Sequence, residues 1–220
     1  MVAARRRFLG SGHYQIFSDA LNLLAEKYLP AGPCSVLDAG CGEGYYTGRL
    51  ADSLTAAGHR AELFGFDISK AAVKAAAKAY KNIAFAVGSA FAAPVLSASA
   101  DLLADLFAPI VPVEFARVVK SGGVMILAVP SRHHLYGLKE ILYHAPYENE
   151  QKDTAYPGFA FLGRVPVRGS LETDDPQVIR DLFAMTPYAW KTPWEGRERL
   201  SRLASLKTEI GFDFLLYRRK

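Results

Sequence analysis

From residue 33 to about residue 130, short apolar runs alternate with segments of helical periodicity. Helices are predicted at residues 46–57, 69–80 and 113–119. Parallel strands need a crossover between them, so this alternation predicts an α/β fold with a doubly wound, mostly parallel sheet. The predicted strands centre on Val36, Phe64, Ile83, Leu103 and the run VMILAVP that follows Gly122-Gly123.

The segments on either side complete the expected architecture. Residues 14–28 repeat apolar side chains at helical spacing and end at Pro30 and Gly32, which predicts an amphipathic N-terminal helix. We expect a single domain spanning residues 1–220, with no internal boundary. In the C-terminal part we predict an inserted loop-rich region at about 145–175 with at most a short strand near 164–168, helices at 176–185 and 195–203, and an antiparallel edge strand at 210–217.

Composition excludes several classes of protein. Of 220 residues, 50% are hydrophobic and two are cysteine, which rules out a disordered, collagen-like or disulfide-stapled chain. No apolar run approaches the roughly eighteen residues of a membrane span, and none behind Arg5–Arg7 suits a signal peptide. We therefore expect a cytoplasmic protein with no membrane partner. The net charge of +4 permits an anionic partner such as RNA without demonstrating one.

The most informative segment is DAGCGEGYY, residues 38–46, between the first predicted strand and the next helix. Glycines there let the backbone turn tightly and approach a ligand at a helix N-terminus. A dinucleotide fingerprint starting at Gly40 needs a third glycine at position 45, where Tyr45 stands. The glycines fall instead at positions 40, 42 and 44, which weakens a nicotinamide or flavin interpretation.

An acidic residue ends the second predicted strand. The carboxylate of Asp67, in GFDIS, is placed to accept hydrogen bonds from both hydroxyls of a ribose. The alternative is that Asp67 caps the helix that begins near Ser69. The glycine loop before it favours the ligand interpretation.

Together these elements resemble class I S-adenosylmethionine-dependent methyltransferases, over roughly residues 33–130. In that superfamily the D-x-G-x-G-x-G loop holds the methionine and ribose parts of the cofactor. The resemblance implies a Rossmann-like sheet, S-adenosyl-L-methionine as cofactor and S-adenosyl-L-homocysteine as product. It says little about the methyl acceptor.

A narrower resemblance spans nearly the whole chain. The segments ARRRFLGSGHY, CGEGYYT, GFDISKAAVKAAAKAY, ARVVKSGG, RHHLYGLKEILY and MTPYAW are similar to those of bacterial guanine-N1 methyltransferases of large-subunit ribosomal RNA. That family implies methyl transfer to N1 of a guanine in a ribosomal RNA hairpin, by a homodimer. The resemblance carries most of the candidate cofactor-binding residues over by motif, and Ser89 is added to them. The full set is Tyr14, Asp38, Gly40, Gly42, Gly44, Tyr45, Tyr46, Asp67, Ser89 and His134.

The chain departs from the family in two places. Members normally begin with a zinc module of cysteines and a histidine, whereas here Met1 stands directly before the methyltransferase motifs. We expect either a fragment or a member that has lost the module. Cys34 and Cys41 cannot make a four-ligand site, so we expect no metal. The second departure is Asp105, where a basic residue is expected.

Asp105 is the candidate catalytic residue. Guanine N1 carries a proton at neutral pH, so a base that accepts it assists methylation. Asp105, at the end of the fourth predicted strand, is the first candidate and His134 the second, while His133 has no clear role. The alternative for Asp105 is a surface or capping group.

The target base must be unpaired or extruded from its stack to be reached. Two other functions stay open: a small-molecule methyltransferase with an apolar lid over its acceptor, and a non-catalytic cofactor-binding protein. Candidate phosphate contacts are Arg5–Arg7, Arg164, Arg168, Arg197, Arg199, Arg218, Arg219 and Lys220, and candidate stacking residues are Tyr188 and Trp190.

Overall fold

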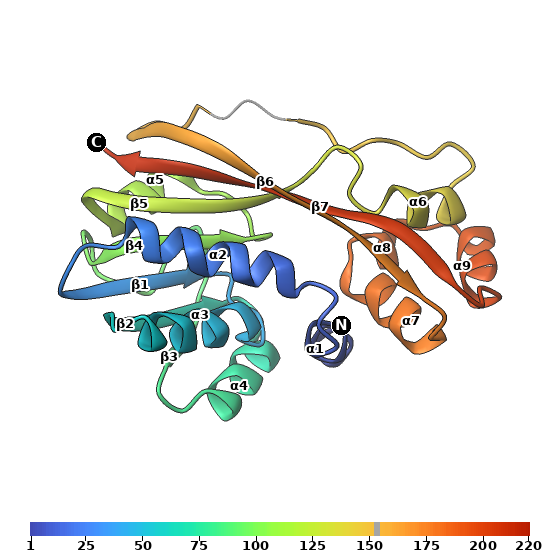
Figure 1. The fold of residues 1–220 in the computed structure, drawn as a ribbon, viewed down its shortest axis with the longest axis horizontal. Helices are drawn as coiled ribbons and strands as arrows, with labels where there is room; N and C mark the ends of the chain where they lie inside the picture. Colours follow the sequence, from blue (N-terminus) through green and yellow to red (C-terminus); the bar gives the residue numbers. More distant parts are fainter. Residues whose placement is uncertain (152–154) are drawn as a thin grey trace. The chain divides into compact units, whose positions relative to one another are not determined.

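Seven strands of the described residues form one sheet, in the order β3-β2-β1-β4-β5-β7-β6 (Figure 1). The computed structural model describes residues 1–151 and 155–220. Strands β1 to β5 pair in parallel, and the sheet has an antiparallel edge, as the sequence predicts. The strand predicted at 210–217 is not the edge itself, because β6 adds to it as the last strand of the sheet. The strands are β1 Pro33–Ala39, β2 Arg60–Asp67, β3 Ala84–Val87, β4 Ala100–Leu106, β5 Val119–Pro130, β6 Phe159–Thr173 and β7 Leu206–Arg219.

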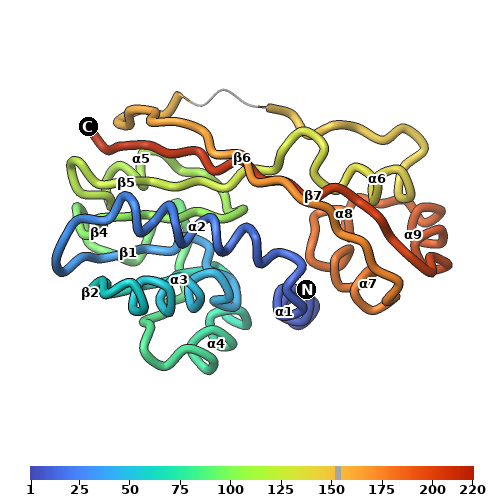
Figure 2. Tube along the Cα trace, in the orientation of Figure 1, coloured from blue at the N-terminus to red at the C-terminus, as the bar shows by residue number. Residues whose placement is uncertain are grey.

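The chain divides into two compact units, which we call the sheet unit and the helical unit. The sheet unit comprises residues 17–129, 155–165 and 213–220, and the helical unit comprises residues 1–16, 130–151 and 166–212. Strands β6 and β7, which are neighbours in the sheet, contribute residues to both units (Figure 2).

In the sheet unit, apolar burial explains the parallel sheet. Strand β4 is buried along almost its whole length, as expected when both faces of a sheet are covered. Helices α3 and α4 pack beside β2 and β3 (Figure 1). Ser69 starts α4, because its hydroxyl accepts a hydrogen bond from the amide of Ala72. The helices of this unit are α2 Gln15–Tyr28, whose first two residues belong to the helical unit, α3 Tyr45–Ala56, α4 Lys70–Ala79 and α5 Pro112–Val118.

The helical unit contains α1 Val2–Gly10, α6 Tyr136–Leu142, α7 Pro176–Met185, α8 Tyr188–Lys191 and α9 Trp194–Ser201. Helix α1 packs on α7, where Arg7 donates two hydrogen bonds to the buried carboxylate of Asp181, at 2.8 and 2.7 Å. Asp175 caps α7 by accepting from Gln177, which agrees with the predicted helix start. No helix among the described residues is long and apolar enough to cross a membrane.

The expected loop-rich region is the main error of the sequence analysis. Strand β6 occupies 15 residues of the segment 145–175, far more than the short strand predicted; residues 152–154 lie outside the described part. Pro166 and the nearby glycines favour a loop in the sequence, but β6 is the last strand of the sheet. An edge strand tolerates proline, since one side of its backbone needs no partner. Helices α1, α6 and α8 are also absent from the prediction.

Candidate cofactor site and catalytic edge

The glycine loop lies where β1 and β4 are neighbours at the carboxyl edge of the sheet. From β1 the sheet continues through β2 to one side and through β4 to the other. Connections diverge at such a switch point, and open α/β sheets bind ligands there. Ala39, the last residue of β1, is in register with Asp105 of β4, so the loop and this carboxylate leave the sheet side by side.

The loop after β1 is hydrogen-bonded to the end of β2. The amides of Gly40 and Cys41 donate to the carbonyl of Phe66 at 2.8 and 3.0 Å, and the amide of Gly42 donates to Asp67 Oδ2 at 3.0 Å. A pyrophosphate-binding loop needs such amides for the anion. Here the amides already donate to the carbonyl of Phe66 and the carboxylate of Asp67, so they are not left for an anion. This agrees with the glycine spacing, which also argues against a dinucleotide.

Two of the glycines are required for different reasons. At Gly40, with φ of +80°, a Cβ would lie 2.4 Å from the Cβ of Ala108, so a side chain cannot be added without moving the turn after β4. At Gly44, with φ of +84°, a Cβ would meet Tyr80 and Ala76 of the α4 region at 3.0 and 3.1 Å. Gly44 therefore allows close packing of two segments, a structural role.

Asp67 joins two segments at the same edge. Its Oδ1 accepts from the amide of Ser69 at 2.7 Å, and its Oδ2 accepts from Gly42. Ser69, and not Asp67, caps α4. Each carboxylate oxygen can accept more than one hydrogen bond, so the half-buried Asp67 keeps acceptor capacity for hydroxyl groups.

Of the other predicted cofactor residues of the sheet unit, Asp38, Tyr45 and Tyr46 flank this loop along the chain, and Ser89 follows β3. Asp38 is buried, and its Oδ2 accepts from the hydroxyl of Thr47 on α3 at 2.5 Å, which fixes the helix to β1. Tyr46 is buried, and its ring centroid lies 5.1 Å from that of the half-buried Tyr45. Ser89 accepts from the amide of Phe91 in the turn after β3.

Asp105 is a buried carboxyl, and one of its two oxygens has no hydrogen-bond partner among the described residues. The side chain is 1% exposed; Oδ1 accepts from the amide of Ala108 at 2.9 Å, and Oδ2 has no hydrogen-bond partner within the described residues. Burial, and to a smaller extent the charge of Asp38, raises the pKa of Asp105 to about 7, against the hydrogen bond from Ala108. A carboxyl with this pKa accepts and releases protons near neutral pH. Asp105 is not a surface group.

Tyr14 and His134 lie together in the helical unit. Tyr14 Oη is 3.4 Å from His134 Nε2, and His134 Nδ1 accepts from the amide of Gly211 at 3.2 Å. Burial, assisted by the charge of Lys139, lowers the pKa of His134 to about 3, so the imidazole is neutral. Because Nδ1 accepts, Nε2 carries the proton and donates to Tyr14. This tautomer has no lone pair left for a guanine proton and disfavours His134 as a base.

The predicted site residues thus form two groups. The structure brings Asp38, Gly40, Gly42, Asp67 and Asp105 to one edge of the sheet unit, and it pairs Tyr14 with His134 in the helical unit. Sequence reasoning did not identify Thr47 as the partner of Asp38. The only sequence signal for this role is the position of Thr47, at the third residue of the helix that follows the glycine loop. His133 is exposed and lies 2.8 Å from Glu148 Oε1, outside both groups.

Comparison with known proteins decides the family. The chain is 30% identical over 215 residues to the 23S rRNA (guanine(748)-N(1))-methyltransferase of Streptomyces fradiae, covering 94% of this chain and 74% of that one. It is 31% identical over 223 residues to YxjB of Bacillus subtilis (strain 168), provisionally named a 23S rRNA (guanine-N(1)-)-methyltransferase, covering 98% and 78%. Residues 32–163 match the family described as "Methyltransferase domain". The chain belongs to the 23S rRNA (guanine-N1)-methyltransferase family.

This methyltransferase also shares its fold with proteins of remote sequence. The crystal structure of YcgJ from Bacillus subtilis matches with a TM-score of 0.54 at 15% identity, covering 92% of this chain and 99% of that one. At this identity the likeness concerns the fold alone. It agrees with the α/β sheet predicted from the alternation of strands and helices.

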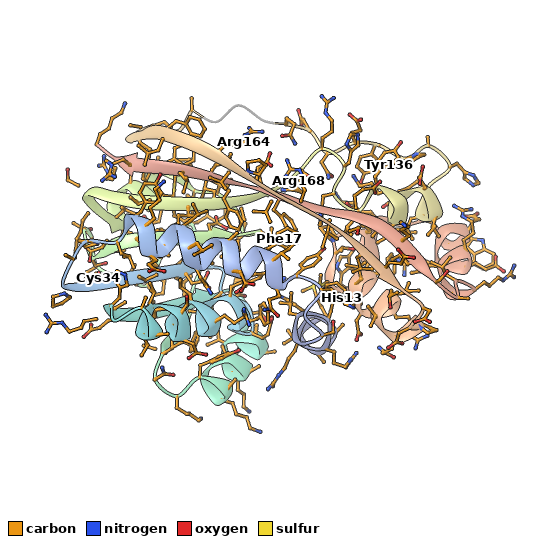
Figure 3. The ribbon with its side chains drawn as sticks, viewed as in Figure 1. His13, Phe17, Cys34, Tyr136, Arg164 and Arg168 are labelled. Atoms are coloured by element: carbon orange, nitrogen blue, oxygen red, sulfur yellow. The ribbon has the colours of Figure 1, made fainter. Side chains whose placement is uncertain are left out.

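Several arginines predicted to contact phosphate bind the methyltransferase itself. On β6, Arg164 pairs with Asp213 at 3.0 Å and Arg168 donates to the carbonyl of Phe212 at 2.8 Å (Figure 3). Arg197, Arg199, Arg218 and Arg219 likewise donate to backbone carbonyls. These side chains have structural roles that the sequence did not reveal. Trp190 is 78% exposed, as a stacking residue requires, whereas Tyr188 packs against Tyr143.

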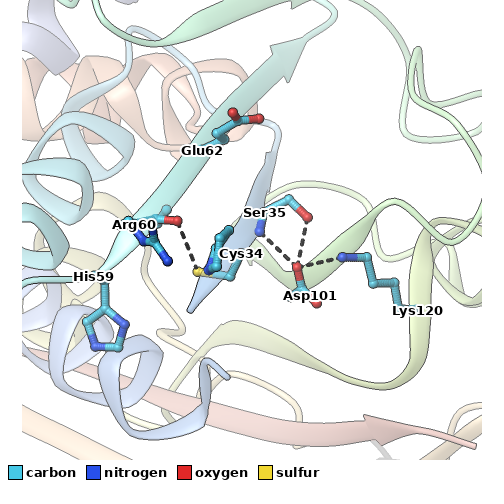
Figure 4. A pocket seen from close by; sticks show the side chains of 9 residues that line it. Cys34, Ser35, His59, Arg60, Glu62, Asp101 and Lys120 are labelled. Carbon is cyan, nitrogen blue, oxygen red and sulfur yellow. Dashed lines mark hydrogen bonds and ion pairs between the residues drawn. The ribbon is translucent and has the colours of Figure 1, made fainter. Parts of the chain in front are cut away.

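A separate pocket lies at the amino ends of β1 and β2, away from the carboxyl edge of the sheet that carries the glycine loop (Figure 4). Its polar groups bind one another: Asp101 Oδ2 accepts from Lys120 Nζ at 2.7 Å and from the amide and hydroxyl of Ser35. Although burial opposes it, these hydrogen bonds hold the pKa of Asp101 below its ordinary value. The nearby Cys34 is a buried, free thiol, as is Cys41.

Proposed function

We propose that this methyltransferase transfers a methyl group from S-adenosylmethionine to N1 of a guanine in a hairpin of 23S ribosomal RNA. The observation that carries the proposal is the similarity to the Streptomyces fradiae enzyme over 94% of this chain, since that enzyme is named for this reaction. The buried carboxyl of Asp105 at the switch point supplies the chemistry that guanine N1 needs.

The glycine loop fits an adenosyl cofactor. Its amides are held by Phe66 and Asp67, and Gly40 leaves no room for a Cβ beside Ala108, so the loop offers a ligand close contact with its backbone without an anion cradle. Asp67 would hold the ribose hydroxyls, and Gly40, Gly42, Tyr45 and Tyr46 would surround the rest. When bound, S-adenosylmethionine supplies an electrophilic methyl group on its sulfonium and leaves as S-adenosylhomocysteine. Asp38, Gly44, Ser89, Tyr14 and His134 complete the proposed cofactor set.

Asp105 acts as the general base in this proposal. Its buried Oδ2, which has no hydrogen-bond partner among the described residues, accepts the proton of guanine N1 as N1 acquires its methyl group, so that N1 keeps the electron pair that forms the new bond. A pKa of about 7 leaves the carboxyl ionised in much of the population near neutral pH, and burial keeps water away from the transfer. The protonated carboxyl then releases its proton to solvent before the next turnover.

The remaining expectations form part of the same proposal. We expect residues 1–220 to act as one methyltransferase domain, in the cytoplasm where ribosomal RNA is available, and as a homodimer. Family resemblance supports the dimer, and sedimentation or light scattering of the purified chain measures it. A single species of about 24 kDa, the mass of one chain, would contradict it.

The reaction is tested with radiolabelled S-adenosylmethionine and unmodified 23S ribosomal RNA, followed by mass identification of the labelled nucleoside. We expect N1-methylguanosine, with label lost in Asp105→Asn while cofactor binding is retained. Label on a small metabolite in place of RNA would assign the chain to small-molecule methylation. Cofactor binding without transfer to either acceptor would make it a non-catalytic cofactor-binding protein.

A further inference from the structure

The net positive charge of the chain is concentrated in one segment of the sheet unit. Residues 68–100 contain four lysines and no arginine, aspartate or glutamate, so this segment alone accounts for the chain's net charge of +4. The lysines are Lys70, Lys74 and Lys78 on α4 and Lys81 just after it, which we call the lysine stripe. All four are exposed. Basic and acidic side chains balance in the rest of the chain.

The three helical lysines lie on one face of α4. They recur at every fourth residue, and positions four apart are neighbours on a helix surface. Helix α4 packs beside β2 and β3 (Figure 1), and its buried residues are Ala72, Val73 and Ala76. Ala76 also packs on the glycine loop, since a Cβ at Gly44 would meet it at 3.1 Å. The lysine stripe therefore lies on the side of α4 opposite its packed face.

The protein does not neutralise this charge. None of the four ammonium groups forms an ion pair with another of the described residues, and Lys81 Nζ donates only to the carbonyl of Ala77, at 3.1 Å. Like charges four residues apart destabilise a helix, and a cation at its first residue, Lys70, opposes the helix dipole. Six alanines among its ten residues keep α4 helical despite this repulsion. Helix stability therefore does not explain the lysine stripe, whereas an anion bound along it would relieve the repulsion.

The lysine stripe matches a nucleic-acid backbone in spacing. From Lys70 to Lys78 the helix rises about 12 Å, and one nucleic-acid strand presents a phosphate about every 3.4 Å along its axis. Each lysine can therefore meet a phosphate of the same strand. The exposed residues next to the lysines include Ala71 and Ala77, whose small side chains allow a backbone to come close. A helix that binds a membrane surface would instead need bulky apolar side chains there.

We propose that the lysine stripe binds phosphates of the substrate RNA and leads that strand to the carboxyl edge of the sheet. The inference rests on the proposed function, and it names the surface of the sheet unit that holds the RNA. The stripe begins beside the candidate cofactor site, because Lys70 follows Ser69, whose amide donates to Asp67 Oδ1 at 2.7 Å. Phosphate contacts carry no sequence information, so the stripe sets affinity and register and not the choice of guanine.

The test replaces the three helical lysines together, by Lys70→Gln, Lys74→Gln and Lys78→Gln. Binding of unmodified 23S ribosomal RNA to this glutamine variant and to the parent is measured over a range of salt concentrations. The slope of log affinity against log salt should become shallower by about two, since each phosphate contact with a single strand contributes about 0.7. In methyl transfer, KM for RNA should rise by roughly three- to 150-fold, the range of three exposed ion pairs, while kcat stays unchanged.

Two further variants control for folding and for net charge. Arginine at the same three positions keeps the charge and should preserve both KM and the salt slope. A matched variant lowers the net charge equally at three exposed cations that each contact another side chain of this protein, and it should bind RNA like the parent: Lys27→Gln, Arg202→Gln and Lys207→Gln. The glutamine variant should unfold at or above the parent's temperature, because glutamine forms helix as well as lysine does and the like-charge repulsion is gone.

Binding and methyl transfer are separate measurements, so this inference and the proposed function can fail separately. If the parent transfers no methyl group to RNA, the proposed function is wrong. If the parent methylates RNA and the glutamine variant keeps the parent's salt slope and KM, only the lysine stripe is wrong. An equal loss of affinity in the matched variant would assign the effect to net charge and would also overturn the lysine stripe.

Discussion

Asp67 Oδ2 accepts a hydrogen bond from the amide of Gly42 at 3.0 Å, and so the carboxylate that ends β2 fastens the loop that follows β1. One side chain therefore shapes the glycine loop and, in the proposed function, binds the ribose. Its loss affects both the empty loop and the bound ligand.

Asp67→Ala should weaken S-adenosylmethionine binding by roughly ten- to a thousandfold, because it removes charge-assisted hydrogen bonds and releases the loop. Asp67→Asn keeps one acceptor oxygen and should fall between Asp67→Ala and the parent. Isothermal titration calorimetry measures both. Glu62, exposed on the same strand, is the matched control, and Glu62→Ala should bind like the parent. Normal affinity in Asp67→Ala would remove this residue from the site.

Gly40→Ala should destabilise the protein more than Gly58→Ala. Both glycines have φ near +80°, so both variants carry the left-handed penalty of ~1–2 kcal/mol. A Cβ at Gly58 meets nothing within 4 Å, whereas one at Gly40 collides with Ala108, which adds ~1–3 kcal/mol. Urea unfolding compares the two variants, and equal destabilisation would show that the turn after β4 yields freely. Only Gly40→Ala should also weaken cofactor binding.

The rate of methyl transfer should rise with pH through about 7 and then level off. The pKa of Asp105 is raised by burial to about 7, and only the ionised carboxylate accepts a proton. Single-turnover rates at saturating RNA and cofactor measure this limb. Asp105→Asn should lower the rate by ~10²–10⁴-fold and abolish the limb. The matched control is Asp52→Asn, at an exposed position on α3. If the pH dependence survived in Asp105→Asn, it would have to be assigned to another group.

Asp105 should also change how stability depends on pH. Its folded pKa lies above its unfolded value of 3.8, so the folded state holds a proton that the unfolded state has lost between pH 4 and 7. The free energy of unfolding should therefore decrease as pH rises through this window, by an amount on the order of a few kcal/mol. Asp105→Asn should gain stability relative to the parent at pH 8 and not at pH 4. Urea unfolding at both values measures the difference.

His134 should have the opposite dependence. Its pKa is lowered by burial from 6.5 to about 3, so the unfolded state takes up the proton first as pH falls below 6.5. Stability from this group is present above pH 6.5 and is lost toward pH 3. His134→Leu should be less sensitive to acid in that window, compared by urea unfolding with the exposed control His144→Leu. An unchanged pH slope in His134→Leu would mean that the imidazole is hydrated.

Most of the sheet was predictable because its signals are local. Strands β1 to β5 read as apolar runs, and α7 begins at the residue expected because Asp175 and Pro176 form a helix start. Strand β6 was not predictable, since whether Pro166 breaks a strand depends on its place at the sheet edge. The candidate site divides in the same way. The places of Gly40 and Asp67 at the site could be predicted from the spacing of the motif, whereas the pKa of Asp105 depends on burial that only the folded chain creates.

The arginines mark a further limit of the sequence. A run of positive charge predicts a surface for phosphate, but nothing local shows that Arg164 faces Asp213 or that Arg219 binds the carbonyls of Ala116 and Gly158. Those partners are far apart along the chain. Arginine counts therefore overstate the hydrogen-bond donors that this protein can devote to RNA.

The hydrogen bonds from Gly40 and Cys41 to Phe66 join protein groups only, so they do not need a ligand to form. The loop is thus preorganised: its shape is set by the end of β2 before a cofactor arrives, and binding need not order it. Association with S-adenosylmethionine should then be limited by encounter and not by a conformational change. An inhibitor that copies the adenosyl group would meet a rigid surface, and its affinity would depend on complementarity to that fixed shape.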